Sequence, residues 1–339
     1  MMDQHLAHVT WTRAAWTASG VVGSSATVKV YLEDFLDNHL PARRGGTISK
    51  GTIDNYRYSA RHVVDRIGNV RMDRLTPAII ESRLLRPMAE EDYSHSTLMR
   101  ARLVLSLAMD HAVRRGELGR NVAALATIPH TTPREPRKSL TAAQARDLLR
   151  AARGERLEAA IVTQLLLGLR PGELLGLQWS DLHGDVLHVQ RSVKMEDGKL
   201  VLGDTKTEAS NRPLRIPRPV KDALKKHRAS QREEIKYAES WDDLDMIFPT
   251  SHGTITDLHN YRRTLRRIVG KAEIEGSWTS HELRHSAISL LCDAGVPLEQ
   301  VADQMGHVDT RMIQRTYRHR LGTPVDAAVD TMNELFASQ

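Results

Sequence analysis

Six side chains in the second half of the chain could together carry out group-transfer chemistry on an anion. Two arginines supply planar forks that bind phosphate oxygens in pairs. Histidines titrate near neutral pH, a lysine can donate a proton, and a tyrosine hydroxyl can act as a covalent nucleophile. Acting together, such residues could serve phosphoryl transfer in a scheme that requires no metal and no nucleotide. In chain order the residues are Arg170, Lys206, His281, Arg284, His307 and Tyr317.

The string GLRPGELLGLQW predicts a turn that leads into a helix. Pro171 stands at the expected first helical position, and Glu173 falls in the first turn, three residues after Arg170. Taken alone, Arg170 is more typical of a solvated side chain at a helix N-terminus. Taken alone, Lys206 is more typical of a surface lysine in a turn before a strand, and Tyr317 of a packed tyrosine near a helix end.

The string SHELRHSAISLLCDAG predicts a helix that starts with a capping box, because Thr279 is followed three residues later by Glu282. His281, Arg284 and His285 have the i, i+3, i+4 spacing that places side chains on one side of a helix, away from its apolar face. Three basic groups near a helix N-terminus indicate an anion site.

HELRH also matches the zinc-protease motif HExxH, so a zinc hydrolase is an alternative hypothesis. The fixed charge of Arg284 would stand beside the metal ion, and Ile288 occupies the position where the extended motif needs glycine. Glu299 or His307 would have to supply the third ligand, and neither has a compelling spacing. We therefore expect no metal and no other cofactor.

As an ordered set, the six residues resemble those of the tyrosine site-specific recombinases, also called the phage-integrase family. The resemblance extends over roughly residues 27–322. It is strongest in GLRPGELLGLQW, in HELRHSAISLL and in the segment from Gly306 to Tyr317. The sequence LRPGELLGLQW is similar to sequences found in integrases of actinobacterial phages and mobile elements.

The resemblance implies an enzyme that cuts and rejoins DNA strands through a 3′-phosphotyrosine intermediate, for integration or excision of a mobile element. A resolvase or invertase with the same chemistry is one alternative, and a catalytically silent DNA-binding relative is another. In the implied site, Arg170 and Arg284 grip the scissile phosphate, Lys206 sits in a mobile hairpin, His281 and His307 are the two histidines, Tyr317 is the nucleophile, and Glu173 supports Arg170.

The pattern of apolar residues predicts a mainly α fold in two domains. Residues 27–128 read as four or five helices, and residues 139–322 as mostly helical with one small antiparallel sheet. The basic, proline-rich segment 129–138 marks the linker, and 323–339 form a last amphipathic helix that could be exchanged between protomers. The resemblance implies that 27–128 are a core-DNA-binding domain and 139–322 a catalytic domain, and that the two clamp DNA. The extension 1–26 before them is too short for an arm-binding domain.

Composition agrees with a DNA-acting protein. Lys and Arg number 48 against 42 Asp and Glu, a formal charge of +6 that fits contact with phosphates. The sequence contains no run of 18 apolar residues, so it predicts no membrane-spanning helix. Cys292 is the single cysteine, which excludes an internal disulfide framework. We expect a cytoplasmic, nucleoid-associated protein. The resemblance implies recombination sites in double-stranded DNA as partners, a homo-oligomeric, tetrameric synapse, and an excisionase or host DNA-bending protein as accessory factor.

Overall fold

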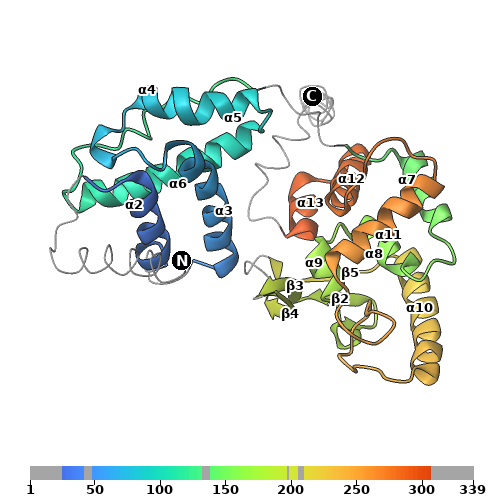
Figure 1. Cartoon of the computed structure of the whole chain (residues 1–339). Helices are drawn as coiled ribbons and strands as arrows, with labels where there is room; N and C mark the ends of the chain where they lie inside the picture. The colour runs from blue at the N-terminus through green and yellow to red at the C-terminus, as the bar shows by residue number, and fades with distance from the viewer. Residues whose placement is uncertain (1–24, 42–47, 132–137, 197, 205–209, 307–339) are drawn as a thin grey trace, which may run out of the picture. The chain divides into compact units, whose positions relative to one another are not determined.

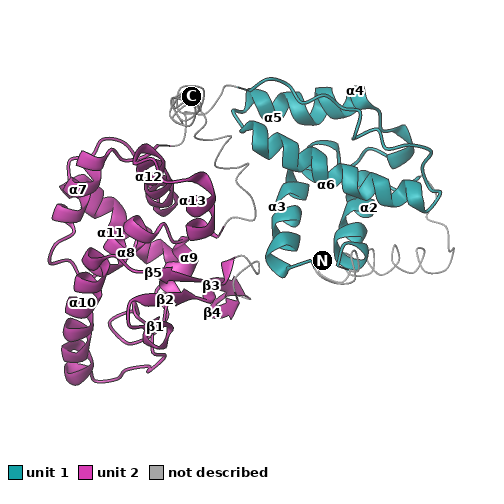
Figure 2. Cartoon of the chain, turned by 180° about the vertical axis from the view of Figure 1, so that it is seen from behind, with its two compact units in different colours: residues 1–135 teal, residues 136–339 magenta. Residues whose placement is uncertain are grey.

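The computed structural model of the chain describes residues 25–41, 48–131, 138–196, 198–204 and 210–306, and it divides into two compact units (Figures 1 and 2). The first unit covers residues 1–135 and the second covers residues 136–339. The boundary falls inside 129–138, the segment that the sequence marks as a linker. Each unit buries its own apolar core.

The described part of the first unit is helical, as the sequence predicts. Thr27, Thr76 and Ser94 cap three of its helices, each accepting a hydrogen bond from a backbone N–H of the following first turn. One helix runs on from α4 through a π-helical turn into α5, where Pro87 lacks an N–H. The elements are α2 (Val28–Asp34) with the π-helical turn Phe35–His39, α3 (Lys50–Ile67), α4 (Pro77–Ile80), the π-helical turn Glu81–Leu85, α5 (Arg86–Glu90) and α6 (His95–Arg114).

The second unit is built around one helix, α8 (Glu158–Leu167), which is buried on almost every side. Apart from Glu158, Thr163 and Gln164 its residues are apolar, as expected for a helix inside a core. Around it pack α7 (Ala142–Ala151), α9 (Pro171–Leu175), α10 (Arg218–Tyr237), α11 (Leu258–Lys271) and α12 (Ser280–Asp293), and α13 (Leu298–Met305) packs against α12. None of the helices in the described ranges combines the length and the apolar character needed to cross a bilayer.

The strands are antiparallel, as predicted, but within the described residues they form two small sheets instead of one. The expected strand 185–193 is divided at Gln190 into β2 (Val186–Val189) and β3 (Arg191–Glu196). β2 pairs with β1 (Leu182–His183) and β5 (Arg212–Arg215), whereas β3 pairs with β4 (Lys199–Asp204) as a separate hairpin. The alternation of apolar and polar residues does not show which strand each half of 185–193 will pair with.

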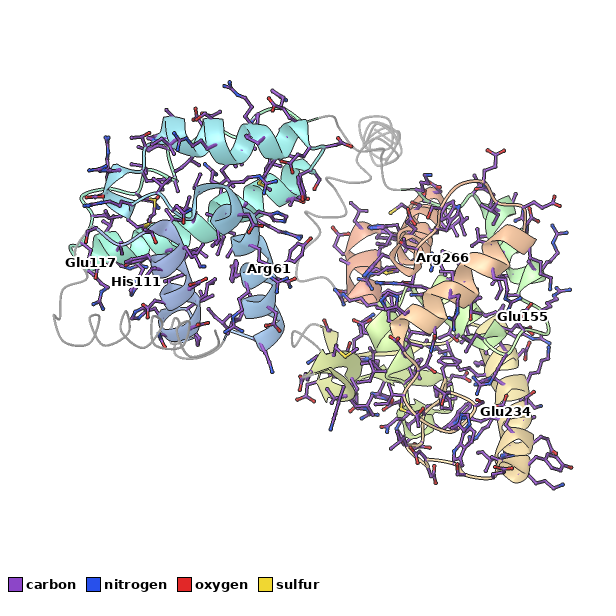
Figure 3. The ribbon with its side chains drawn as sticks, in the orientation of Figure 1. Arg61, His111, Glu117, Glu155, Glu234 and Arg266 are labelled. Atoms are coloured by element: carbon purple, nitrogen blue, oxygen red, sulfur yellow. The ribbon has the colours of Figure 1, made fainter. Side chains whose placement is uncertain are left out.

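Ion pairs fasten the outer helices of the second unit to the loop before α8. Arg267 on α11 donates two hydrogen bonds to Glu155, at 2.6 and 3.0 Å, and Arg156 binds Glu234 on α10 at 2.8 and 2.9 Å. Figure 3 labels both carboxylates on this side of the unit. Arg267 is the main cause that lowers the pKa of Glu155 to about 2. These partners are partly exposed, so each pair adds little stability.

Gly168 ends α8 in the left-handed conformation, with φ of 65°. A Cβ there would lie 2.4 Å from Sδ of Met305 and 3.3 Å from Cβ of Ala287. The glycine therefore permits both the turn and the close approach of α12 and α13 to the end of α8.

We predict that Gly168→Ala lowers the free energy of unfolding by about 2–4 kcal/mol, the sum of backbone strain and overpacking. Gly154→Ala is the matched control, because Gly154 has φ of 78° but nothing within 4 Å of the position that a Cβ would take. The control should lose only the strain, about 1–2 kcal/mol. Urea unfolding followed by tryptophan fluorescence measures both losses, and equal losses would show that contact with Met305 is unimportant.

Candidate active site

Arg170 stands at the N-terminal end of α9, where the backbone turns sharply after α8. Pro171 occupies the first helical position, and the Glu173 carboxylate accepts the backbone N–H of Arg170 at 3.0 Å. The carbonyl of Leu169 accepts a hydrogen bond from the buried Gln164, whose own side-chain oxygen accepts one from the Tyr261 hydroxyl at 2.6 Å. This network fixes the short segment that carries Arg170.

The buried carboxylate of Glu173 binds two guanidinium groups. Its Oε1 accepts from Nη1 of Arg170 at 2.6 Å, and its Oε2 accepts from Nη2 of Arg212 at 3.2 Å. Burial raises the pKa of the Glu173 carboxyl, but the charge of Arg212 and the hydrogen bonds from Arg170 outweigh burial and leave that pKa below its ordinary value. Glu173 is therefore an anion at neutral pH, inside the unit.

Arg284 lies on α12, and its side chain enters the interior instead of facing solvent. It is 5% exposed and donates from Nη1 to the carbonyl of Gly168 at 2.6 Å and from Nη2 to the carbonyl of Met305 at 2.7 Å. Arg284 thus joins the C-terminal ends of α8 and α13. Carbonyls at helix C-termini lack partners within the helix and carry partial negative charge, which a guanidinium complements.

The C-terminus of α13 receives all three arginines, on three successive carbonyls. Nε of Arg212 donates to Gln304 at 2.7 Å, Nη2 of Arg284 to Met305 at 2.7 Å, and Nη2 of Arg170 to Gly306 at 3.2 Å. We call Arg170, Arg212, Arg284, Glu173 and these three carbonyls the arginine cluster. Its side chains carry three positive charges and one negative charge, so it suits an anionic ligand.

The structure brings together three of the residues predicted from the sequence, namely Arg170, Glu173 and Arg284. His281 lies one turn before Arg284 on α12, where its side chain is exposed. Lys206, His307 and Tyr317 lie outside the described residues, as do the expected helices at 309–317 and 323–339.

The acidic residue of HELRH has a structural use at the start of α12. Glu282 accepts the backbone N–H of Thr279 at 2.5 Å, the capping contact that the sequence predicts. Among the residues with described positions, no three His, Cys, Asp or Glu side chains gather in a way that could hold a metal ion.

Arg212 is the member of the cluster that the sequence interpretation missed. It is 6% exposed on β5, where Arg212 and Leu214 are buried and Pro213 and Arg215 are exposed. The signal is the alternation itself, because residues two apart in a strand share a face and Arg212 therefore shares the apolar face of Leu214. An arginine on an apolar face needs a buried acceptor, which Glu173 supplies.

Comparison with known proteins decides the family. The model of the Phage integrase family matches residues 138–322, more than half of the chain. An integrase from Streptomyces ambofaciens is 32% identical over 324 residues, which cover 91% of this chain and 80% of that protein. The chain belongs to the phage integrase family. It is a tyrosine recombinase, as the ordered residues predict.

Other relatives and solved structures agree with this assignment to the tyrosine recombinases. A XerC-like tyrosine recombinase from Caldanaerobacter subterraneus is 29% identical and covers 81% of this chain and 76% of its own length. The fold matches the Tn1549 transposon integrase in complex with transposon right end DNA, with a TM-score of 0.75, 22% identity, and coverage of 92% of this chain and 100% of that one. A lambda integrase tetramer bound to a Holliday junction has a TM-score of 0.63 at 19% identity, over 86% of this chain and 77% of that one.

We predict that Glu173→Gln lowers the free energy of unfolding by about 3–5 kcal/mol near pH 7, because it leaves Arg212 buried without a counter-charge. The folded-state pKa of Glu173 lies below its ordinary 4.5, so its contribution is complete above that value and disappears as the pH falls through the folded-state pKa. The stability difference between wild type and variant should therefore be constant from about pH 7 to about pH 5 and shrink at lower pH.

Urea unfolding at several pH values measures this difference in stability. Glu155→Gln is the matched control, because it removes a carboxylate from a partly exposed pair and should shift the urea midpoint much less. A Glu173→Gln variant as stable as the control would mean that the arginine cluster does not depend on this charge.

Proposed function

We propose that this protein is a site-specific DNA recombinase that cuts and rejoins strands through a 3′-phosphotyrosine intermediate, to integrate or excise a mobile element. The observation that carries the proposal is the arginine cluster, in which hydrogen bonds fix both the half-exposed Arg170 and the buried Arg284. A planar guanidinium binds two oxygens of one phosphate, and fixed charge aimed at the non-bridging oxygens stabilises the extra negative charge of the transition state.

In the proposed reaction the hydroxyl oxygen of Tyr317 attacks the scissile phosphorus, and the bond from phosphorus to the 5′ oxygen breaks. Lys206 gives a proton to the departing 5′ oxygen, while His281 and His307 hydrogen-bond the phosphate or accept the tyrosine proton. The phosphotyrosine conserves the bond energy, so attack by a new 5′ hydroxyl reverses the step and joins the strands. No metal takes part in this scheme.

The proposed substrate is a pair of double-stranded DNA recombination sites, in keeping with the relatives solved with transposon end DNA and core-site DNA. The lambda integrase tetramer on a Holliday junction supports a tetrameric synapse for this chain as well. In this proposal residues 27–128 form the core-binding domain and residues 139–322 the catalytic domain. An excisionase or a host DNA-bending protein would set the direction of the reaction.

Tyr317→Phe should retain DNA binding and abolish covalent attachment to DNA, because it removes only the nucleophilic oxygen. The assay traps covalent protein on a nicked suicide duplex that carries a candidate site and separates it on a denaturing gel. Tyr237→Phe is the matched control, since Tyr237 is 76% exposed at the end of α10 and should react as wild type. Retained attachment in Tyr317→Phe would contradict the proposed nucleophile.

Arg170→Lys and Arg284→Lys should each slow cleavage at saturating DNA by about 10²–10³-fold, the usual effect of removing one donor to a developing oxyanion. Lysine keeps the charge but loses the planar fork. Single-turnover cleavage of the suicide duplex measures the rate, with the exposed Arg267→Lys as control. Wild-type rates in both variants would exclude bidentate contact as the source of catalysis.

A further inference from the structure

Arg212 lies at the centre of the arginine cluster, although no step of the proposed reaction uses it. Each nitrogen of its guanidinium has a different acceptor. Nε donates to the carbonyl of Gln304 at 2.7 Å, Nη1 to the carbonyl of Ser210 at 3.0 Å, and Nη2 to the Glu173 carboxylate at 3.2 Å. One side chain therefore ties β5, α9 and the end of α13 together.

Arg212 and Arg170 share one carboxylate but differ in exposure. The side chain of Arg170 is 36% exposed, whereas that of Arg212 is 7% exposed and that of Glu173 is 3% exposed. A ligand can approach Arg170 from solvent, whereas all three guanidinium nitrogens of Arg212 already donate to acceptors of the protein itself. The charges of the two arginines and Glu173 sum to one net positive charge. A ligand can reach that charge only at Arg170, the exposed member of the three.

Removing Arg212 would change the electrostatics of Arg170 without touching it. Glu173 would then face a single guanidinium and neutralise it, so that an incoming phosphate would meet a paired arginine. Interactions between charges in a buried site are strong because water screens them poorly. The loss would also release the carbonyl of Gln304, next to the two carbonyls that hold Arg284 and Arg170.

We propose that Arg212 is a positioning residue for DNA cleavage: it balances the charge of Glu173, and Arg170 thereby keeps its positive charge for the phosphate. The inference rests on the proposed function, because it assigns Arg170 to the scissile phosphate. It also gives Glu173 a double use, as hydrogen-bond acceptor for Arg170 and as counter-ion for Arg212.

The test compares single-turnover formation of covalent protein on the suicide duplex, at saturating DNA, for wild type, Arg212→Met, Glu173→Gln and the double variant. Arg212→Met should slow the reaction at least about tenfold, which corresponds to about 1.4 kcal/mol of lost attraction between Arg170 and the phosphate in the transition state. Adding Glu173→Gln to Arg212→Met should raise the rate again, because the uncompensated carboxylate is removed. Arg215→Met is the matched control, an exposed arginine on the same strand that should leave the rate unchanged.

A purely structural Arg212 gives a different pattern, in which the double variant is as slow as Arg212→Met or slower. That result, or a wild-type rate in Arg212→Met, overturns the role of Arg212. If circular dichroism shows that Arg212→Met is unfolded, Arg212→Lys and Arg212→Gln replace it. Both keep a polar donor and only the lysine keeps the charge, so the lysine variant should react at least about tenfold faster. Equal rates overturn the inference.

The proposed function fails separately from the role of Arg212. Wild-type protein that forms no covalent complex contradicts the recombinase proposal and the inference that rests on it. Wild-type cleavage together with an insensitive Arg212 contradicts only the inference.

Discussion

Three guanidinium groups donate to three successive carbonyls at the C-terminus of α13, and the arrangement of the second unit depends on this contact. Like charges so close together repel each other, and a single buried carboxylate, Glu173, offsets only part of that repulsion. The helix end supplies the remainder, since its unpaired carbonyls carry partial negative charge. Neither the carboxylate nor the helix end would hold three buried or half-buried arginines alone.

The contact makes separate elements interdependent. Arg170 comes from the start of α9, Arg212 from β5 and Arg284 from α12, so α13 cannot move without changing hydrogen bonds to all three. Gly168 allows the approach, because a larger residue would collide with Met305. In the sequence, α13 leads directly to His307 and, ten residues later, to Tyr317. Under the proposed function, a phosphate held by Arg170 and Arg284 would therefore be coupled to the helix that precedes the proposed nucleophile in the sequence.

Much of this could be predicted from residue types and spacing. Helical periodicity and caps predicted nearly all of the described helices, and the family resemblance implied the contact of Glu173 with Arg170. The family also followed from the ordered residues. The position of the Arg284 side chain could not be predicted. The helical pattern suggests that it lies on a polar face, but in the structure it is buried and donates to carbonyls at the ends of two other helices.

Long-range pairing explains the other differences. Strand 185–193 divides because its halves find different partners, and partners distant in sequence leave no mark in a local alternation pattern. Arg212 escaped notice for the same reason, since its acceptors Glu173 and Gln304 are 39 and 92 residues away. The sequence places Arg212 on the apolar face of a strand, which is unusual for an arginine. Its hydrogen-bond acceptors, however, can be identified only from the folded unit.

The most direct measurement is a crystal structure of the Tyr317→Phe protein bound to a DNA half-site with an intact scissile phosphate. The account predicts that Arg170 and Arg284 both donate to the non-bridging oxygens of that one phosphate, at about 3 Å. It also predicts that Arg212 keeps its bonds to Glu173 and to the carbonyl of Gln304. A complex in which the scissile phosphate contacts neither Arg170 nor Arg284, or in which Arg212 leaves Glu173 to bind DNA, would contradict it.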